Sequence, residues 1–185
     1  MNIICNNCVG GRIYQLLGTP FNHPLVWCRI YYANFKKLIQ NIKDIDYTKY
    51  RFVNKYGTSQ IIIGDDIELN FTHYRYDASY DTPTKVGNLD IMSKDIEKYA
   101  IEKYTTRLKR FNLNDDFCFI LTDLDNLKLK DEEIVDFLNI DTKYQKLCIT
   151  NRNINSNKTP IIHTAETNTA KLAKLVIESN LMKLK

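Results

Sequence analysis

The sequence contains no apolar run that could cross a bilayer. Its longest runs, such as Ile61–Ile63 and Phe117–Leu121, fall far below the about 20 residues that a spanning helix needs. The amino terminus has no basic segment followed by an apolar stretch, so it carries no recognisable secretory signal. We therefore expect a cytoplasmic protein without a membrane span.

The cysteines do not form the pattern of a disulfide scaffold. There are five, an odd number, and three of them lie among apolar residues, as buried free thiols do: Cys28, Cys118 and Cys148. Cys5 and Cys8 have the spacing of a redox or zinc pair, but no second CxxC pair or histidine cluster follows to complete a tetrahedral site. This pattern fits a reducing compartment and predicts no metal site.

The common nucleotide-binding and nucleophile signatures are missing too. The sequence has no GxxxxGK[ST] loop, no GxGxxG fingerprint and no GxSxG elbow. Its net charge of +4 is modest and its lysines are interleaved with acids, which argues against nucleic acid as a partner. The sequence therefore identifies no cofactor beyond an activated donor, either an acyl donor or a nucleotide-sugar.

What the sequence does contain is the composition of one globular domain over residues 1–185. Hydrophobic residues make up 44% and charged residues 26%, and 185 residues suffice to bury a core. Helical and extended patterns alternate along the chain, which favours an α/β fold, as a three-layer or mixed-sheet sandwich. The strands are predicted over residues 2–7, 60–63, 67–73, 117–121, 146–150 and 160–163, and the helices over residues 12–17, 32–44, 96–111, 131–138 and 168–182.

Three further local features are predicted. Gly10 and Gly11 form a turn between the first strand and the first helix, and Ser93 caps the long helix that ends at Phe111. The segment Asp77–Asp90 is rich in Asp, Thr, Pro, Gly and Ser, which is typical of a loop.

Cys8 follows the first strand and stands close to the start of a helix. The partial positive charge of a helix amino terminus favours the reactive thiolate of a cysteine. Gly10 and Gly11 would let a substrate carbonyl approach backbone amides, which form an oxyanion hole. The alternative is that Cys8 is a small buried residue and the glycines make a tight turn.

A cysteine nucleophile needs a base and a polar group that orients the base. His73, at the end of a predicted strand, is the candidate base, with a hydrogen-bonded core or rim histidine as the alternative. Asp123 and Asp125 follow the buried strand Phe117–Leu121, at the edge where open α/β sheets place functional groups. Either carboxylate could orient His73 or act in a turn. Together, Asp123 and Asp125 have the spacing of the DxD metal-binding motif of a glycosyltransferase.

Three basic side chains share one face of the long helix at intervals of four and three residues: Lys103, Arg107 and Arg110. Such a face could receive the phosphate or carboxylate of a substrate. The alternative is a solvated basic face paired with neighbouring acids.

Motifs spread over residues 2–150 resemble those of a bacterial family, the domain of unknown function 1919 family, whose members are often labelled exopolysaccharide biosynthesis proteins. The motifs are Asn6-Asn7-Cys8-x-Gly10-Gly11-x-x-Tyr14-Gln-x-Leu-Gly18, Phe35-x-x-Leu-x-x-Asn41, Phe71-x-His73-Tyr74 and Arg107-x-x-Arg110-Phe-Asn. Val9 stands where the family usually has tryptophan. The order of cysteine, histidine and acid is similar to that of papain-like hydrolases and acyltransferases.

The resemblance implies a cytoplasmic role in making or decorating a surface polysaccharide. It does not identify a reaction. From their positions along the chain together with these motifs, Cys8, His73 and Asp123 or Asp125 are the candidate catalytic residues. The candidate substrate-binding residues are Asn7, Gly10, Gly11, Tyr14, Tyr74, Arg107 and Arg110.

Three functions follow from these features. The first is an enzyme that transfers an acyl or related group onto a sugar, in peripheral contact with a glycan-assembly complex. The second is a glycosyltransferase-like protein that uses a nucleotide-sugar. The third is a non-catalytic glycan-binding module that uses Tyr74, Tyr76 and Tyr80.

Overall fold

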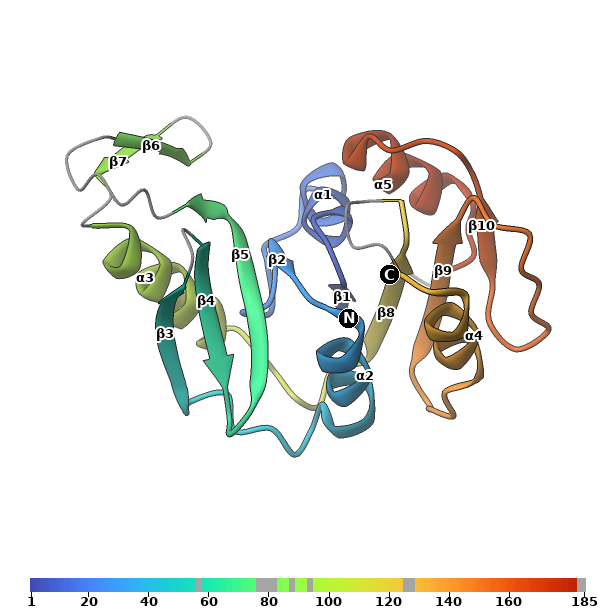
Figure 1. Ribbon diagram of the computed structural model, residues 1–185, viewed down its shortest axis with the longest axis horizontal. Helices are drawn as coiled ribbons and strands as arrows, with labels where there is room; N and C mark the ends of the chain where they lie inside the picture. Colours follow the sequence, from blue (N-terminus) through green and yellow to red (C-terminus); the bar gives the residue numbers. More distant parts are fainter. Residues whose placement is uncertain (56–57, 76–82, 87–88, 93–94, 125–128, 183–185) are drawn as a thin grey trace.

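A parallel sheet of four strands lies at the centre of one half of the molecule (Figure 1). In this computed structural model the strand order is β1-β8-β9-β10, with all neighbours parallel. The strands are β1 (Asn2–Cys5), β8 (Phe117–Thr122), β9 (Gln145–Thr150) and β10 (Ile161–His163). All six residues of β8 are buried, which confirms the prediction of a strand covered on both faces.

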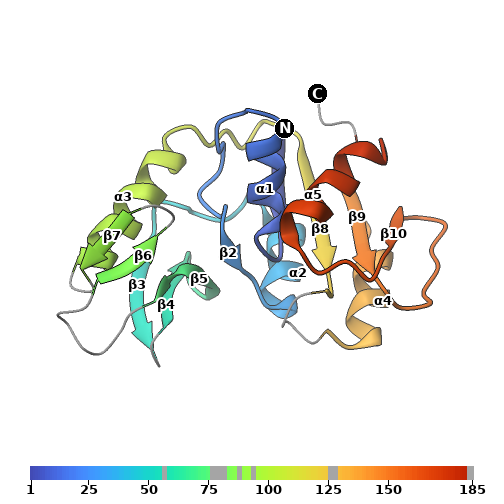
Figure 2. The same ribbon diagram turned by 90° about the horizontal axis from the view of Figure 1, so that it is seen from above.

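Helices cover both faces of this sheet (Figure 2). Side chains alternate along the strands, so β8 turns Cys118 and Ile120 to one face and Phe119 to the other. The first face packs on α1 (Val9–Leu16) and α5 (Thr169–Glu178), and the second face packs on α2 (Tyr32–Asn41) and α4 (Asp131–Asn139). The predicted three-layer α/β sandwich is therefore present.

A second, antiparallel sheet lies beside the sandwich, with strand order β2-β5-β4-β3. Its strands are β2 (Cys28–Arg29), β3 (Tyr50–Lys55), β4 (Thr58–Ile63) and β5 (Ile67–Arg75). Along the chain, β5 is followed by a hairpin of β6 (Pro83–Val86) and β7 (Leu89–Met92) and then by α3 (Ile96–Leu108). One continuous core cluster contains Phe119 of the parallel sheet, Ile61 of the antiparallel sheet and Tyr104 of α3. The two sheets thus share one hydrophobic core.

The structure describes residues 1–55, 58–75, 83–86, 89–92, 95–124 and 129–182; for the strand residues within 54–59 and 71–92 it describes the backbone only. No helix in these ranges is long and apolar enough to span a membrane.

The free edge of β1 is closed by side chains instead of by another strand. Ile3 donates its amide to the Tyr14 hydroxyl at 2.9 Å, and its carbonyl lies 2.5 Å from Nε2 of His23. Nδ1 of His23 accepts the amide of Leu25, so the neutral ring carries its proton on Nε2. These contacts satisfy backbone groups that an exposed edge strand leaves open.

Most predicted elements are present with shifted ends, and three predictions are wrong. The first helix begins at Val9, so Gly10 and Gly11 lie inside α1 and do not form a turn before it. The segment predicted as a loop over Asp77–Asp90 contains β6 and most of the hairpin. The predicted last helix is shorter and ends at Glu178. Strand β3 was not predicted, and Ser93 lies outside the described residues.

The buried imidazole of His23 makes stability depend on pH. Burial, with a smaller contribution from nearby Arg107, lowers the pKa of His23 from the ordinary 6.5 to about 3. The unfolded chain therefore binds a proton that the folded chain rejects, and the free energy of unfolding falls as the pH decreases from about 6.5 towards 3. The contribution of His23 to this slope is at most about 1.4 kcal/mol per pH unit.

Urea titrations between pH 4 and pH 7 test this expectation. His23→Gln should be less stable than wild type at pH 7 and should have a flatter pH dependence. His163→Gln, which changes an exposed side chain on β10, serves as the matched control. Equal slopes for wild type and His23→Gln would contradict a neutral buried His23.

Candidate functional site

The chain leaves neighbouring parallel strands toward opposite faces of the sheet. After β1 it enters α1 on one face, and after β8 it enters α4 on the other. Such a topological switch opens a crevice beyond the carboxyl ends of the two strands, where open α/β sheets bind their ligands. The residues that follow β1 and β8 are therefore the candidate site.

Asn6 holds these two strand ends together. Its side-chain amide donates to the Thr122 carbonyl at 2.8 Å, and its side-chain oxygen accepts the Thr122 amide at 2.9 Å. Both residues are fully buried. The next residues along the chain, Asn7 and Asp123, therefore lie just beyond the carboxyl ends of these neighbouring strands.

Asn7 has one side-chain atom bound and the other without a partner. Its Oδ1 accepts the Val9 amide at 3.0 Å and the Cys5 thiol at 3.1 Å. These two donors fix the orientation of the amide group, so the NH₂ group points away from them. Asn7 is 3% exposed, and within the described part of the chain its Nδ2 has no hydrogen-bond partner.

Asp123 shows the same division. Its Oδ2 forms an ion pair with Nε of Arg152 at 2.8 Å and accepts the Thr150 hydroxyl at 2.9 Å. Its Oδ1 is buried without a hydrogen-bond partner among the residues that the structure describes, and the side chain is 2% exposed. The role of Asp123 in a site, predicted from the sequence, stays a prediction.

Arg152 is a site residue that the sequence analysis missed. Besides Asp123, its guanidinium contacts the Asp131 carboxylate and the Leu129 carbonyl, and the hydrogen bond from Arg152 to Asp131 raises the Arg152 pKa. Arg152 therefore clamps both ends of the connection between β8 and α4. The available signal was its position two residues beyond β9, at the same sheet edge as Asp123.

Cys8 stands at the junction of Asn7 and α1. It is the amino-terminal cap residue of that helix and is half-buried, whereas the other four cysteines are buried. Cys8 thus stands at the amino terminus of α1, three residues after β1 ends, where the helix dipole is positive.

Comparison with known proteins identifies the chain. A family described as "Domain of unknown function (DUF1919)" matches residues 1–184. The chain belongs to this family. The resemblance found in the sequence motifs is confirmed, and the similarity to papain-like enzymes stays a prediction.

A relative from Haemophilus influenzae, described as an uncharacterized protein, is 28% identical to the chain over 138 residues. The match covers 75% of this chain and 57% of the relative. The chain thus spans little more than half the length of that protein.

Several DUF1919 motif residues have structural contacts in the fold. A Cβ atom on Gly10 would lie 3.0 Å from Cβ of Cys5, and one on Gly11 would lie 2.7 Å from the Trp27 indole. Gly10 therefore lets α1 pack on β1, and Gly11 lets the Trp27 ring lie against the helix. The backbone of Trp27 has a φ of 69°. This packing occupies the space next to the glycines in which we predicted a substrate carbonyl.

Tyr14 also contacts the fold and not the crevice. Its ring is buried against Phe21 and its hydroxyl accepts the Ile3 amide on the free edge of β1. Burial raises the Tyr14 pKa to about 12, so the hydroxyl stays protonated.

The two DUF1919 motif arginines are separated by the fold. Arg107 is 6% exposed, donates to the Val26 carbonyl at 2.8 Å and lies 5.4 Å from the centre of the Phe21 ring. Arg110 is exposed, as is Lys103, which lies over the Tyr99 ring. The predicted common basic face is therefore wrong: Arg107 points into the fold and fixes the 21–27 segment.

The remaining predicted site residues fall outside what the structure describes. His73 and Tyr74 lie in β5, where only the backbone is described, and Asp125 lies in the segment 125–128. The backbone of β5 pairs with β2 through Phe71 and Cys28, and Ile30 just after β2 donates its amide to the Asn6 carbonyl. Strand β5 therefore runs on the β1 side of the crevice.

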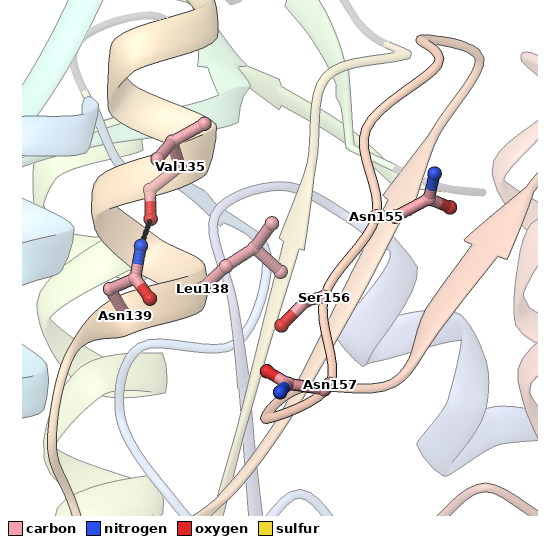
Figure 3. A pocket seen from close by; sticks show the side chains of 6 residues that line it. All are labelled: Val135, Leu138, Asn139, Asn155, Ser156 and Asn157. Atoms are coloured by element: carbon pink, nitrogen blue, oxygen red, sulfur yellow. Dashed lines mark hydrogen bonds between the residues drawn. The ribbon is translucent and has the colours of Figure 1, made fainter.

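A pocket elsewhere on the surface offers less chemistry (Figure 3). It lies between α4 and the segment that joins β9 to β10, and it is lined by Val135, Leu138, Asn139, Asn155, Ser156 and Asn157. None of these side chains is ionisable, and the Ser156 hydroxyl accepts the amides of Lys158 and Thr159. Within the described ranges, no group of three or more His, Cys, Asp or Glu residues could hold a metal ion.

The different positions of the two arginines can be tested by a matched pair of variants. Arg107→Met should lower the free energy of unfolding by about 1–3 kcal/mol, because the Val26 carbonyl loses a charged donor inside the protein. Arg110→Met should change it by less than about 0.5 kcal/mol, because the side chain is exposed. Urea denaturation of both variants measures the difference, and equal effects would contradict the structural role of Arg107.

Proposed function

We propose that this protein is a group-transfer enzyme of surface-glycan biosynthesis that forms a covalent intermediate on Cys8. The observation that carries the proposal is the position of Cys8: a half-buried cysteine at the N-cap position of α1, at the switch between β1 and β8. Asp123 and Asn7, which follow β8 and β1, each have a buried side-chain atom without a hydrogen-bond partner in the described part of the chain. This combination is typical of an active site.

The proposed reaction is an acyl transfer onto a sugar. His73 takes the proton of the Cys8 thiol, and the thiolate attacks the carbonyl carbon of an acyl donor. The leaving group departs with that proton, and a thioester remains on Cys8. A sugar hydroxyl then gives its proton to His73 and attacks the thioester, which releases the acylated sugar and the thiol. Asp123 or Asp125 orients the imidazole in this scheme.

Burial supports Cys8 over the other thiols as the nucleophile. Burial raises the pKa values of Cys5, Cys28 and Cys148 to about 12, and it raises that of Cys118 as well. These four thiols stay protonated at neutral pH and are closed to a substrate. None of the five cysteines is joined in a disulfide, which supports a reducing cytoplasm as the location.

The alternative is a glycosyltransferase-like protein in which Cys8 is structural. It is favoured by the switch-point crevice, which suits a nucleotide-sugar, and by the DxD spacing of Asp123 and Asp125. The third possibility, glycan binding by Tyr74, Tyr76 and Tyr80, depends on side chains outside the described residues. In each case the partner is a sugar or glycan, and contact with a glycan-assembly complex would be peripheral.

Thiol labelling tests the proposal. At pH 7 the native protein should incorporate one equivalent of iodoacetamide, on Cys8, faster than a free thiol does, because the helix amino terminus favours the thiolate. Cys8→Ser should abolish this labelling, and Cys118→Ser, the matched control on β8, should leave it unchanged. Peptide mass spectrometry after timed labelling from pH 5 to pH 9 locates the modified residue. Slow labelling of Cys8, with the rate of an unperturbed thiol, would favour the glycosyltransferase alternative.

A further inference from the structure

Helix α1 carries an arginine one turn beyond Cys8. The Arg12 amide donates to the Cys8 carbonyl at 3.2 Å, and Cys8 has helical backbone angles, so the two residues lie four positions apart on one helix face. Side chains at this spacing have Cβ atoms about 5–6 Å apart, and they lean toward the helix amino terminus. Arg12 is exposed and Cys8 is half-buried. A molecule that reacts at Cys8 can therefore contact Arg12 as well.

Neutral groups hold the Arg12 guanidinium in place. Its carbon lies 5.3 Å from the centre of the Trp27 ring, and Nη1 donates to the Gln15 side-chain oxygen at 2.8 Å. The Trp27 indole is itself fixed, because it lies over Gly11 and makes an edge contact with the Phe21 ring. The guanidinium thus lies against an aromatic ring, a cation–π arrangement that restricts its motion and leaves its charge in place.

No carboxylate neutralises Arg12 within the described part of the chain. By contrast, the exposed lysines of the neighbouring helix α5 form ion pairs, Lys171 with Glu166 and Lys174 with Glu178. The first turn of α1 contains no acidic residue either. Arg12 and the amino terminus of the helix therefore both contribute a positive potential beside Cys8.

The chemistry of this face selects an anion. A guanidinium has five N–H donors in one plane, and Gln15 uses only one of its nitrogens. Carboxylate and phosphate oxygens match the geometry of such donors. We infer that Arg12 binds the phosphate or carboxylate group of the molecule that reacts at Cys8. A phosphorylated donor or an acidic sugar would supply this group. The inference rests on the proposed function for the identity of that molecule as the substrate.

A charged and a neutral alkylating reagent measure the preference for an anion. The Cys8 thiolate displaces iodide from iodoacetate and from iodoacetamide, but only iodoacetate is negatively charged. The ratio of the two rate constants should exceed that of N-acetylcysteinamide by at least about threefold, as expected for a unit charge roughly 6 Å away in water. Dividing by the iodoacetamide rate removes any effect of the thiolate fraction. The preference should decrease in about 1 M NaCl, where the Debye length is about 3 Å.

Two variants that each remove one positive charge locate the preference. Arg12→Gln changes an exposed side chain and should lower the preference for iodoacetate by about three- to tenfold. Lys143→Gln is the matched control: Lys143 is also an exposed cation, 5.5 Å from the centre of the Tyr144 ring, but it precedes β9 at the amino ends of the parallel strands. This variant should keep the wild-type preference. Thermal melting shows that both variants are folded.

Protection of Cys8 from iodoacetamide identifies the source of the anion. Glucose 1-phosphate offers a phosphate and glucuronate offers a carboxylate, and glucose is the uncharged control at the same ionic strength. At least one of the two anions should slow the labelling of the wild type and have less effect on Arg12→Gln.

Four results would overturn the inference: a wild-type preference equal to that of the reference thiol, an unchanged preference in Arg12→Gln, an equal loss in Lys143→Gln, or no protection by either anion. The iodoacetamide rate alone tests the proposed function, so the two can fail separately. If Cys8 reacts slowly with iodoacetamide and still prefers iodoacetate, the nucleophile proposal fails and the anion site stands. If Cys8 reacts rapidly without this preference, the anion site fails alone.

Discussion

Asn6 makes the contact on which the arrangement of the two sheets depends. Its side chain forms two hydrogen bonds with the backbone of Thr122, and its carbonyl accepts the Ile30 amide at 2.9 Å. It thereby extends the pairing of β1 with β8 by one residue and links the parallel sheet to the segment that follows β2. Only a side-chain amide supplies a donor and an acceptor in the geometry of a peptide group, so neither aspartate nor an apolar residue can replace it here.

The hydrogen bonds around the strand ends divide the polar side chains into two kinds. Asn6, Tyr14, His23 and Arg107 place their polar atoms on backbone groups, which closes the fold around β1. Asn7 and Asp123 each have one polar side-chain atom that is hydrogen-bonded and one that has no partner among the described residues. Because an unsatisfied buried atom opposes folding, retaining such atoms just beyond β1 and β8 indicates a constraint other than stability.

The start of α1 contains residues that pack the fold and a residue that is a candidate for chemistry. Gly10 and Gly11 allow the helix to lie directly on Cys5 and beneath Trp27, and this close approach sets Cys8 at the helix amino terminus. Cys5, three residues before Cys8 at the end of β1, is buried under that turn, whereas Cys8 stays half-buried. Residues adjacent in one motif thus have different roles, the glycines in packing and the cysteine in the crevice.

The sequence by itself determined the fold class, the family and most of the elements. Helix and strand periodicity depends on neighbours along the chain, so the strand over Phe117–Leu121 and the helix beginning at Asp131 were found correctly. Local patterns also placed Asp123 at the carboxyl end of a buried strand. They failed at Gly10 and Gly11, whose helical conformation depends on packing against Cys5 and Trp27, and at the hairpin β6–β7, whose turn-rich composition is typical of a loop.

Only the tertiary structure decided which polar groups meet. Arg107 and Arg110 would share a face if the helix continued, but α3 ends at Leu108, so Arg107 is buried in the helix and Arg110 lies exposed beyond it. Arg152 lies 29 residues from Asp123 and reaches it because β8 and β9 are neighbours in the sheet. Whether a side-chain atom is free or bound depends on partners that are distant in the sequence, such as Thr122 for Asn6, 116 residues away. For that reason the half-satisfied pair of Asn7 and Asp123 could be recognised in the folded chain and not in its sequence.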